Sequence, residues 1–365
     1  MSEKKINILV AAGGTGGHLF PAMAVADEIK ERYNKNFNAY FVGNKERIEG
    51  NSVPKAGYPF FDIPMTGLKG KFNPANITMP IKILRSISIC NSLIKRFNID
   101  AVLCAGAYLS YPAGVSASLN RIPLILMESN VYPGKSIKAL SPRARLIFTA
   151  FAETGQYLKK GKNTEIICLG NPVRKNLINL PNKSDSLNVF NLQIGKRTVL
   201  IFGGSLGARS INEGAEKAIR KLPADNYQFI WQTGKNYEPA IDGQANVRIL
   251  KFIDNMAAAY SAADIVVSRS GATSLAEIAV TGKPSILVPY PLAANNHQEY
   301  NADLFANRGA SIKIIDRMVY DVLGYVIEET FDNHAKLEDM IKNAKEFANP
   351  EAAKYVCLEI INLLN

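Results

Sequence analysis

The chain has 365 residues, of which 47% are hydrophobic and 21% are charged, and its formal net charge is +11. This length suits two domains of ordinary size, and the composition excludes an intrinsically disordered protein. The charge favours anionic partners, but no zinc-finger spacing or aromatic ribonucleoprotein motif points to nucleic acid, and no apolar run approaches the roughly 18 residues of a membrane-spanning helix.

A glycine-rich segment follows the first apolar run. Residues 8–12 are apolar, residues 13–18 have the sequence GGTGGH, and a helical pattern runs from Phe20 to Ile29. A strand, a glycine loop and a helix in this order can present backbone N–H groups to an anion, although one such loop alone can be only a tight turn. The third glycine of a dinucleotide-binding fingerprint and the Gly-Lys-Ser/Thr of a Walker loop are missing, which excludes both of these nucleotide sites.

Apolar runs then alternate with helical patterns through the first half of the chain. We expect helices at Ala22–Tyr33 and Ile81–Phe97, and buried strands at Ile6–Ala12, Ala39–Val42, Ala101–Ala105, Leu124–Met127 and Leu146–Phe148. This alternation predicts a parallel sheet that is covered by helices on both faces. The cysteines lack paired or metal-like spacing, and we expect all four to be reduced and buried: Cys90, Cys104, Cys168 and Cys357.

The second half of the chain repeats this arrangement. Residues 203–208 have the sequence GGSLGA, with glycines and a hydroxyl at the same spacing as in the first loop. Two loops of this kind make a shared ligand site more plausible than two simple turns. Further buried strands are expected at Val199–Phe202, Gln228–Gln232, Val247–Lys251, Ile265–Val267 and Ser285–Val288.

The boundary between the two halves is expected near Pro172, within the sequence GNPVR. We therefore expect domains at residues 1–172 and 173–349. The helix at residues 350–365 follows Pro350 and can pack on either domain, and we expect it to return to the first.

Residues 268–277, with the sequence SRSGATSLAE, form the richest stretch. They follow an apolar run and open a helix, whose amino end at Ala272 can face a pyrophosphate. Glu277 lies one to two turns further along, where it can hold both hydroxyls of a ribose or be only a charge on the helix surface. In the loop after the next strand, the amides of Asn296 and Gln298 suit sugar hydroxyls.

These motifs occur together in a familiar order. GGTGGHLFPA, the Glu128–Asn130 turn, GNPVR, GGSLGA, FIDNMAAAY, SRSGATSLAE and the loop to Gln298 follow one another as in the MurG family, which the chain resembles over nearly its whole length. The resemblance implies an α/β GT-B fold, with two Rossmann-like parallel-sheet domains and a cleft between them. It also implies inverting transfer of GlcNAc from UDP-GlcNAc to the 4-hydroxyl of MurNAc in lipid I, undecaprenyl-pyrophosphoryl-MurNAc-pentapeptide, which gives lipid II for peptidoglycan synthesis. No cofactor or metal is required.

The resemblance also assigns residues to UDP-GlcNAc, all of them in the loops described above: Thr15, Gly16, Gly17, Asn130, Arg174, Ser205, Ile253, Ala272, Glu277 and Gln298. Within this set, Ser205, Arg174 and Ala272 would meet the pyrophosphate. The Ile253 backbone would hydrogen-bond the uracil. Glu277 would hold the ribose and Gln298 the GlcNAc, while the others would contact the donor from the first domain.

Inverting transfer needs a base that takes the proton of the acceptor hydroxyl. An ordinary histidine pKa near 6.5 suits this role, so His18 is the candidate and Glu128 the alternative. His18 could instead only orient the phosphate or the acceptor. Two rival functions stay open at this point: another GT-B enzyme, such as a glycolipid glycosyltransferase or a UDP-GlcNAc 2-epimerase, and a non-catalytic UDP-sugar-binding module.

The implied acceptor is a membrane lipid. We therefore expect a peripheral protein at the cytoplasmic face of the bacterial membrane, with the anionic membrane surface and other cell-wall synthesis proteins as partners. Residues 66–97 combine basic and apolar side chains, as a surface that docks to anionic lipid requires. The expected membrane contacts are Lys69, Lys71, Phe72, Ile81, Lys82 and Arg85. Ile83, Ile87 and Leu93 are expected to face the core instead.

Overall fold

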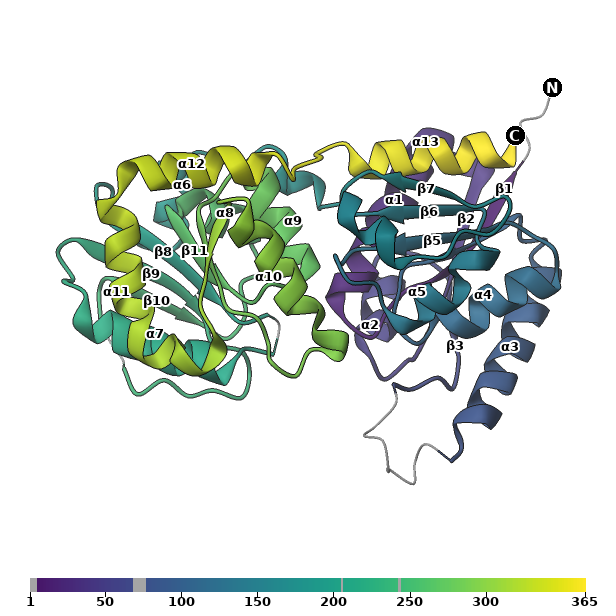
Figure 1. Ribbon diagram of the computed structural model, residues 1–365, viewed down its shortest axis with the longest axis horizontal. Coiled ribbons are helices and arrows are strands. Elements are labelled where there is room, and N and C mark those ends of the chain that lie inside the picture. The colour runs from purple at the N-terminus through teal and green to yellow at the C-terminus, as the bar shows by residue number, and fades with distance from the viewer. Residues whose placement is uncertain (1–4, 68–76, 205, 242–243) are drawn as a thin grey trace. The chain divides into compact units, whose positions relative to one another are not determined.

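The structure is a computed structural model that describes residues 5–67, 77–204, 206–241 and 244–365. The chain divides into two compact units (Figure 1). The first unit comprises Met1–Arg174 together with Asn349–Asn365, and the second comprises Lys175–Ala348.

A seven-stranded sheet forms the centre of the first unit, in the order β3-β2-β1-β4-β5-β6-β7, and the neighbouring strands are parallel. The strands are β1 (Ile6–Ala11), β2 (Phe37–Gly43), β3 (Phe60–Asp62), β4 (Ala101–Cys104), β5 (Leu124–Glu128), β6 (Leu146–Thr149) and β7 (Glu165–Cys168). Successive side chains of a strand point to opposite faces, so β1 supplies Ile8 and Val10 to one core and Leu9 and Ala11 to the other. Both faces of this inner strand are therefore buried, as is usual in parallel sheets.

The α-helices of the first unit are α1 (Gly16–Tyr33), α2 (Ile48–Lys55), α3 (Met79–Arg96), α4 (Ser110–Leu119), α5 (Lys135–Leu140) and α13 (Ala352–Leu364). The C-terminal helix α13 packs beside α1, as Figure 1 shows in yellow and purple. Its Val356 and Ile360 are buried in the same core as Ile8. The last helix of the chain is thus part of the first hydrophobic core.

The second unit has a six-stranded parallel sheet in the order β10-β9-β8-β11-β12-β13. Its strands are β8 (Arg197–Phe202), β9 (Tyr227–Gln232), β10 (Val247–Leu250), β11 (Ile265–Ser268), β12 (Ser285–Leu287) and β13 (Ser311–Lys313). The α-helices are α6 (Lys183–Val189), α7 (Arg209–Lys221), α8 (Met256–Ala262), α9 (Ala272–Thr281), α10 (His297–Asn307), α11 (Val319–Asp332) and α12 (His334–Lys345). Helices α7 and α11 pack together, and Ile211 and Leu323 from them share a core with Trp231. Both units thus have the same Rossmann-like construction.

The predicted parallel sheets are confirmed, and the predicted strands differ from the observed ones by a residue or two at their ends. Strands β3, β7 and β13 were not predicted, because each has only three or four residues and lies at a sheet edge with partly exposed side chains. Helix α1 begins at Gly16 rather than Ala22, since the glycine loop itself forms the first turn. Cys168 is exposed, so the prediction of burial is wrong for this cysteine, although the other three are buried.

Candidate functional site

In each sheet the strand order reverses beside the strand that comes first in the chain. In folds of this kind, ligands usually bind to the loops that follow the carboxyl ends of the strands at this reversal point, and we call this side of the sheet the ligand edge. The reversal lies between β1 and β4 in the first unit and between β8 and β11 in the second. The two glycine loops follow β1 and β8, so each stands at this edge of its own sheet. Ser205, in the second loop, lies outside the described residues.

A buried carboxylate closes the first glycine loop. Glu49, in the first turn of α2, is 0% exposed, and its two oxygens accept the N–H groups of Gly14 at 2.9 Å and of Asn44 at 3.1 Å. Space for the carboxylate exists because two neighbours lack a side chain: a Cβ on Gly13 would lie 2.3 Å from Glu49 Cδ, and one on Gly43 would lie 2.5 Å from Glu49 Cγ. The loop was predicted to present N–H groups to an anion, and its Gly14 N–H donates to an anionic side chain of the protein itself.

His18 lies in the first turn of α1, for which Thr15 is the N-cap residue. Its half-buried imidazole packs against the backbone of Gly106, in the loop after β4, where an added Cβ would lie 2.7 Å from His18 Nδ1. Gly106 also has a φ of 90°, which favours glycine. This glycine therefore makes the turn and leaves room for the ring, which places the imidazole beside the reversal point of the first sheet.

Glu128 ends β5 and accepts hydrogen bonds at both carboxylate oxygens. Oε1 accepts the backbone N–H of Asn130 at 2.9 Å and its side-chain amide at 3.0 Å, and Oε2 accepts the N–H of Gly134 at 2.8 Å. Burial raises the pKa of the Glu128 carboxyl, and the hydrogen bonds from Gly134 and Asn130 oppose this rise. Thr154 Oγ1 also donates to the Asn130 carbonyl at 3.0 Å. The carboxylate of Glu128 thus fixes the orientation of Asn130.

A neutral amide ties the second glycine loop to its neighbours. Gln232, at the end of β9, donates from Nε2 to the Gly204 carbonyl at 2.9 Å and accepts the Ile253 N–H at Oε1 at 2.8 Å. The loop turns tightly over this strand end, since a Cβ on Gly207 would lie 2.0 Å from the Thr233 carbonyl oxygen. Gln232 therefore connects the glycine loop to the segment around Ile253, which was predicted to contact the uracil of the donor.

Helix α9 begins at Ala272 after the N-cap residue Gly271, and the first N–H groups of a helix have no partner within it. Glu277, further along α9, is only 6% exposed, so it is not a charge on the helix surface. Its Oε2 accepts a hydrogen bond at 3.1 Å from the hydroxyl of Tyr260, which is fully buried. A positive helix end and a carboxylate in a fixed orientation thus stand on one helix.

Gln298 is the second residue of α10, and its side-chain oxygen accepts the Tyr290 N–H at 3.0 Å. The Gln298 carbonyl accepts the Ser270 hydroxyl at 2.7 Å, which connects this helix to the loop before α9. The two residues before α10, Asn295 and Asn296, have φ angles of 54° and 56°. Such conformations are uncommon outside glycine and tend to occur at functional sites.

Arg269 was given no role by the sequence. Its side chain is buried and donates from Nη1 to the carbonyls of Val288 at 3.1 Å and Pro289 at 3.2 Å, and from Nη2 to Ser210 Oγ at 3.0 Å. It also forms an ion pair with Asp316. One arginine therefore joins the loops after β11, β12 and β13 to the first turn of α7.

The segment predicted to meet a membrane is only partly described. Three of its predicted contacts lie outside the described residues: Lys69, Lys71 and Phe72. At the amino end of α3 and just before it, Ile77, Ile81 and Leu84 are 78%, 69% and 67% exposed. Arg85 is exposed and Lys82 half-buried beside them. The described part thus presents apolar and basic groups together.

The opposite side of α3 packs inward. Leu93 is buried and Ile83 packs against the same core, as predicted, while Ile87 is half-buried. Met79 is also buried, at 9% exposure. Of the helices that the structure describes, none is both long and apolar enough to cross a bilayer.

Comparison with known proteins agrees with this arrangement. Models of the glycosyltransferase family 28 N-terminal and C-terminal domains match residues 8–149 and 198–356. The UDP-N-acetylglucosamine--N-acetylmuramyl-(pentapeptide) pyrophosphoryl-undecaprenol N-acetylglucosamine transferase of Flavobacterium psychrophilum is 39% identical over 366 residues, which cover 99% of this chain and 98% of the relative. The protein of the same name from Bacteroides thetaiotaomicron is 37% identical over 370 residues, with coverages of 99% and 98%.

A crystal structure of Acinetobacter baumannii MurG superposes with a TM-score of 0.77 at 27% identity, over 98% of this chain and 99% of that one. The chain belongs to the MurG family. It is a glycosyltransferase with the GT-B fold, as the sequence predicts. A putative UDP-N-acetylglucosamine 2-epimerase from Listeria monocytogenes has a TM-score of 0.70 at 15% identity, over 98% and 96% of the two chains, a likeness that shows the fold alone.

Four buried side chains of this MurG-family chain support the predicted site without having been predicted themselves. Three of them lie in segments that the sequence analysis had identified: Gln232 ends an expected strand, Tyr260 lies in FIDNMAAAY and Arg269 lies in SRSG. The sequence did not show which groups these side chains would contact. Glu49 gave no signal at all, because it meets the first glycine loop only in three dimensions. Glu49, Gln232 and Arg269 form hydrogen bonds to loops at the ligand edge, and Tyr260 donates one to Glu277 on α9.

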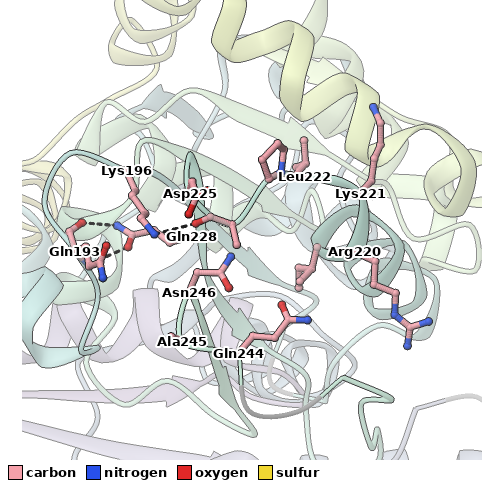
Figure 2. A pocket seen from close by; sticks show the side chains of 13 residues that line it. Gln193, Lys196, Arg220, Lys221, Leu222, Asp225, Gln228, Gln244, Ala245 and Asn246 are labelled. Atoms are coloured by element: carbon pink, nitrogen blue, oxygen red, sulfur yellow. Dashed lines mark hydrogen bonds between the residues drawn. The ribbon is translucent and has the colours of Figure 1, made fainter.

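A separate hollow of about 670 Å³ lies beside the amino ends of strands β8, β9 and β10, away from the family's motifs (Figure 2). Gln193, Lys196 and Gln228 line it. Gln228 Nε2 donates to the Gln193 carbonyl at 2.8 Å, and Lys196 donates to the Ala224 carbonyl at 2.8 Å, so both side chains already have partners within the protein. Within the described ranges, no group of histidine, cysteine, aspartate or glutamate side chains could hold a metal ion.

Proposed function

We propose that this enzyme transfers GlcNAc, with inversion, from UDP-GlcNAc to the 4-hydroxyl of MurNAc in lipid I, and so makes lipid II for peptidoglycan synthesis. Relatives named for this transfer are 37–39% identical over nearly the full chain. The observation in the fold that carries the proposal is the Tyr260–Glu277 pair behind the amino end of α9. A helix end for pyrophosphate and a fixed carboxylate for ribose are what a nucleoside diphosphate sugar requires.

The donor is held mainly by the second unit in this proposal. The pyrophosphate meets the helix end at Ala272, with Ser205 as a further contact, and Gln298 holds the GlcNAc. Arg174, which belongs to the first unit, adds a cation at the pyrophosphate. The Ile253 N–H already donates to Gln232, so we assign the contact with uracil to the Ile253 carbonyl, which would accept the uracil imide N–H.

The first unit supplies the remaining donor contacts and the catalytic base, which takes the proton of the acceptor hydroxyl. Thr15, Gly16 and Gly17 at the start of α1, together with Asn130, contact the donor from this side. His18 is assigned as the base, because its ring is partly exposed at the ligand edge. Glu128 is the weaker choice, since both of its oxygens accept hydrogen bonds inside the protein.

Docking to the membrane is assigned to the start of α3 and the segment before it, with the protein peripheral at the cytoplasmic face. The exposed Ile81 and Leu84 would enter the interface, and Lys82 and Arg85 would meet anionic headgroups, each cation adding roughly 1 kcal/mol. Lys69, Lys71 and Phe72 belong to the same proposed surface. Association with other cell-wall synthesis proteins is part of the proposal but has no residues assigned to it.

The docking surface can be tested with paired acceptors. Replacing Ile81 and Leu84 with Ser should reduce binding to anionic vesicles and transfer to full-length lipid I, while transfer to a short-chain soluble acceptor survives. Ile194→Ser, which changes an apolar residue of the second unit that is 74% exposed, is the control and should alter neither acceptor. Unchanged vesicle binding, or equal loss on both acceptors, would contradict docking at α3.

The function itself is tested by transfer of labelled GlcNAc to a lipid I analogue. We expect a labelled lipid II analogue and release of UDP, with no metal added. Conversion of UDP-GlcNAc alone to its 2-epimer, transfer only to diacylglycerol, or binding of donor without turnover would each contradict the proposal.

A further inference from the structure

Glu49 has no part in the proposed donor or acceptor contacts, yet its carboxylate lies directly against the first glycine loop. It lies in the first turn of α2 and is 0% exposed, so it cannot touch a substrate. A buried carboxylate is costly unless hydrogen bonds compensate it. Here the N–H groups of Gly14 and Asn44 donate to its two oxygens, at 2.9 and 3.1 Å.

Two glycines provide the space for this carboxylate. Gly13 and Gly43 lie against it, and a Cβ on either would approach it to 2.3 or 2.5 Å. Tyr108 lies on the far side of Gly14, with its ring 3.5 Å from where a Gly14 Cβ would stand. The pKa of Tyr108 is raised, first by burial and then by the charge of Glu49.

We propose that Glu49 is a positioning residue for transfer: its carboxylate fixes the loop at Gly13–Gly14 and thereby the start of α1, which carries His18. The loop leads directly into α1 at Gly16, so a shift at Gly14 moves the first helical turn. Reacting groups must be held within a fraction of an ångström, and a misplacement of 1 Å can cost about 100-fold in rate. This inference rests on the proposed role of the His18 end of α1.

Glu49→Gln tests the anchor with little change of volume. Both groups that face the side chain are N–H donors, so in either orientation the new amide nitrogen meets another donor and one backbone N–H loses its acceptor. We expect kcat for transfer to a lipid I analogue to fall about 100-fold, while the KM for UDP-GlcNAc stays within about twofold, because the donor is held mainly by the second unit.

Val53→Ala is the matched control, because Val53 is also fully buried on α2 but is not among the donors to Glu49. It should lower Tm and leave kcat near the wild-type value below the unfolding transition. Gly43→Ala is the second test: it keeps the carboxylate but crowds it, and it should give the same split between kcat and KM. If Glu49→Gln does not fold, the kcat and KM of Gly43→Ala test the positioning role instead.

Hydrogen exchange at the Gly14 amide separates this inference from the proposed function, since it needs no substrate. Exchange should be faster in Glu49→Gln than in wild type and unchanged in Val53→Ala. Wild-type kcat in a folded Glu49→Gln or Gly43→Ala variant, or an equal loss of kcat in Val53→Ala, would overturn the positioning role. An inactive wild type would instead contradict the proposed transfer, and the Gly14 exchange rates alone would then decide whether Glu49 is the anchor.

Discussion

The first glycine loop is anchored by a buried carboxylate, and the second by the neutral amide of Gln232. The loops share their glycine spacing and their place after the first strand of each sheet. In the first, the Gly14 N–H donates to Glu49, which places a negative charge beneath the loop. In the second, the bond from Gln232 goes to the Gly204 carbonyl and adds no charge.

This difference suggests a division of labour. A carboxylate beneath a loop disfavours a phosphate nearby, whereas an uncharged anchor leaves the helix-end field of the second unit intact for an anion. The glycine pattern therefore specifies a turn, and the buried partner of that turn decides which chemistry it serves. We assign most of the donor binding to the second loop and its neighbours. To the first loop we assign proton transfer and the lesser donor contacts of Thr15, Gly16 and Gly17.

The largest effect is expected at the first loop. His18→Ala should lower kcat by roughly 10²–10⁴-fold, the usual contribution of general base catalysis, with little change in affinity for UDP-GlcNAc. His18→Gln, which keeps a polar side chain of similar reach, should be equally slow. A near-normal kcat across pH in His18→Ala would transfer the role of base to another group, with Glu128 as the first to test.

Glu277→Ala should weaken the binding of UDP-GlcNAc instead. Loss of a hydrogen bond to a charged group costs about 1.5–3 kcal/mol, so the KM for UDP-GlcNAc should rise about 10- to 150-fold. Glu277→Gln keeps the size and one acceptor and should lose less. Calorimetry with UDP-GlcNAc provides the check, and unchanged affinity in folded Glu277→Ala protein would remove Glu277 from the ribose site.

Gln232→Glu gives the second loop an anchor like that of the first. The carboxylate loses the donor to Gly204 and brings a negative charge towards the pyrophosphate site, so the Kd for UDP-GlcNAc should rise about tenfold. Gln232→Met loses the hydrogen bond to Gly204 and also the acceptor of the Ile253 N–H, but it adds no charge, and it should cost less because the charge of the anchor dominates. Equal affinities for the two variants at low salt would show that the charge of the anchor does not matter.

Tyr260→Phe is the smallest of these changes, since it removes one hydroxyl and keeps the buried ring. The Glu277 carboxylate loses its fixed partner, and a typical hydrogen bond is worth about 0.5–1.5 kcal/mol, so donor affinity should fall about two- to twelvefold. The kcat at saturating donor should hardly change. A loss larger than that of Glu277→Ala would mean that Tyr260 acts on the donor by another route.

The fold was largely predictable because the central strands are short apolar runs between turns. Leu9 and Val10 are both buried, on opposite faces of one strand, and such a run identifies a covered parallel strand. The edge strand at Glu165–Cys168 was missed, and with it the exposure of Cys168, since a strand with one free edge lacks that continuous pattern.

The site was predictable only in part. Loops at strand ends carry recognisable motifs, which is why Ala272 and Glu277 were assigned. The groups that hold them come from elsewhere in the chain: Glu49 lies 35 residues from Gly14, and Arg269 lies 47 residues from its partner Asp316. No local pattern links such pairs, because only the folded sheet brings them together.

The most direct test of this division of labour is a calorimetric titration of UDP-GlcNAc into the full-length Glu49→Gln and Gln232→Glu variants beside wild type. We expect Glu49→Gln to bind the donor with wild-type affinity and Gln232→Glu to bind it about tenfold more weakly. Weakened donor binding in Glu49→Gln together with unchanged binding in Gln232→Glu would contradict this division of labour.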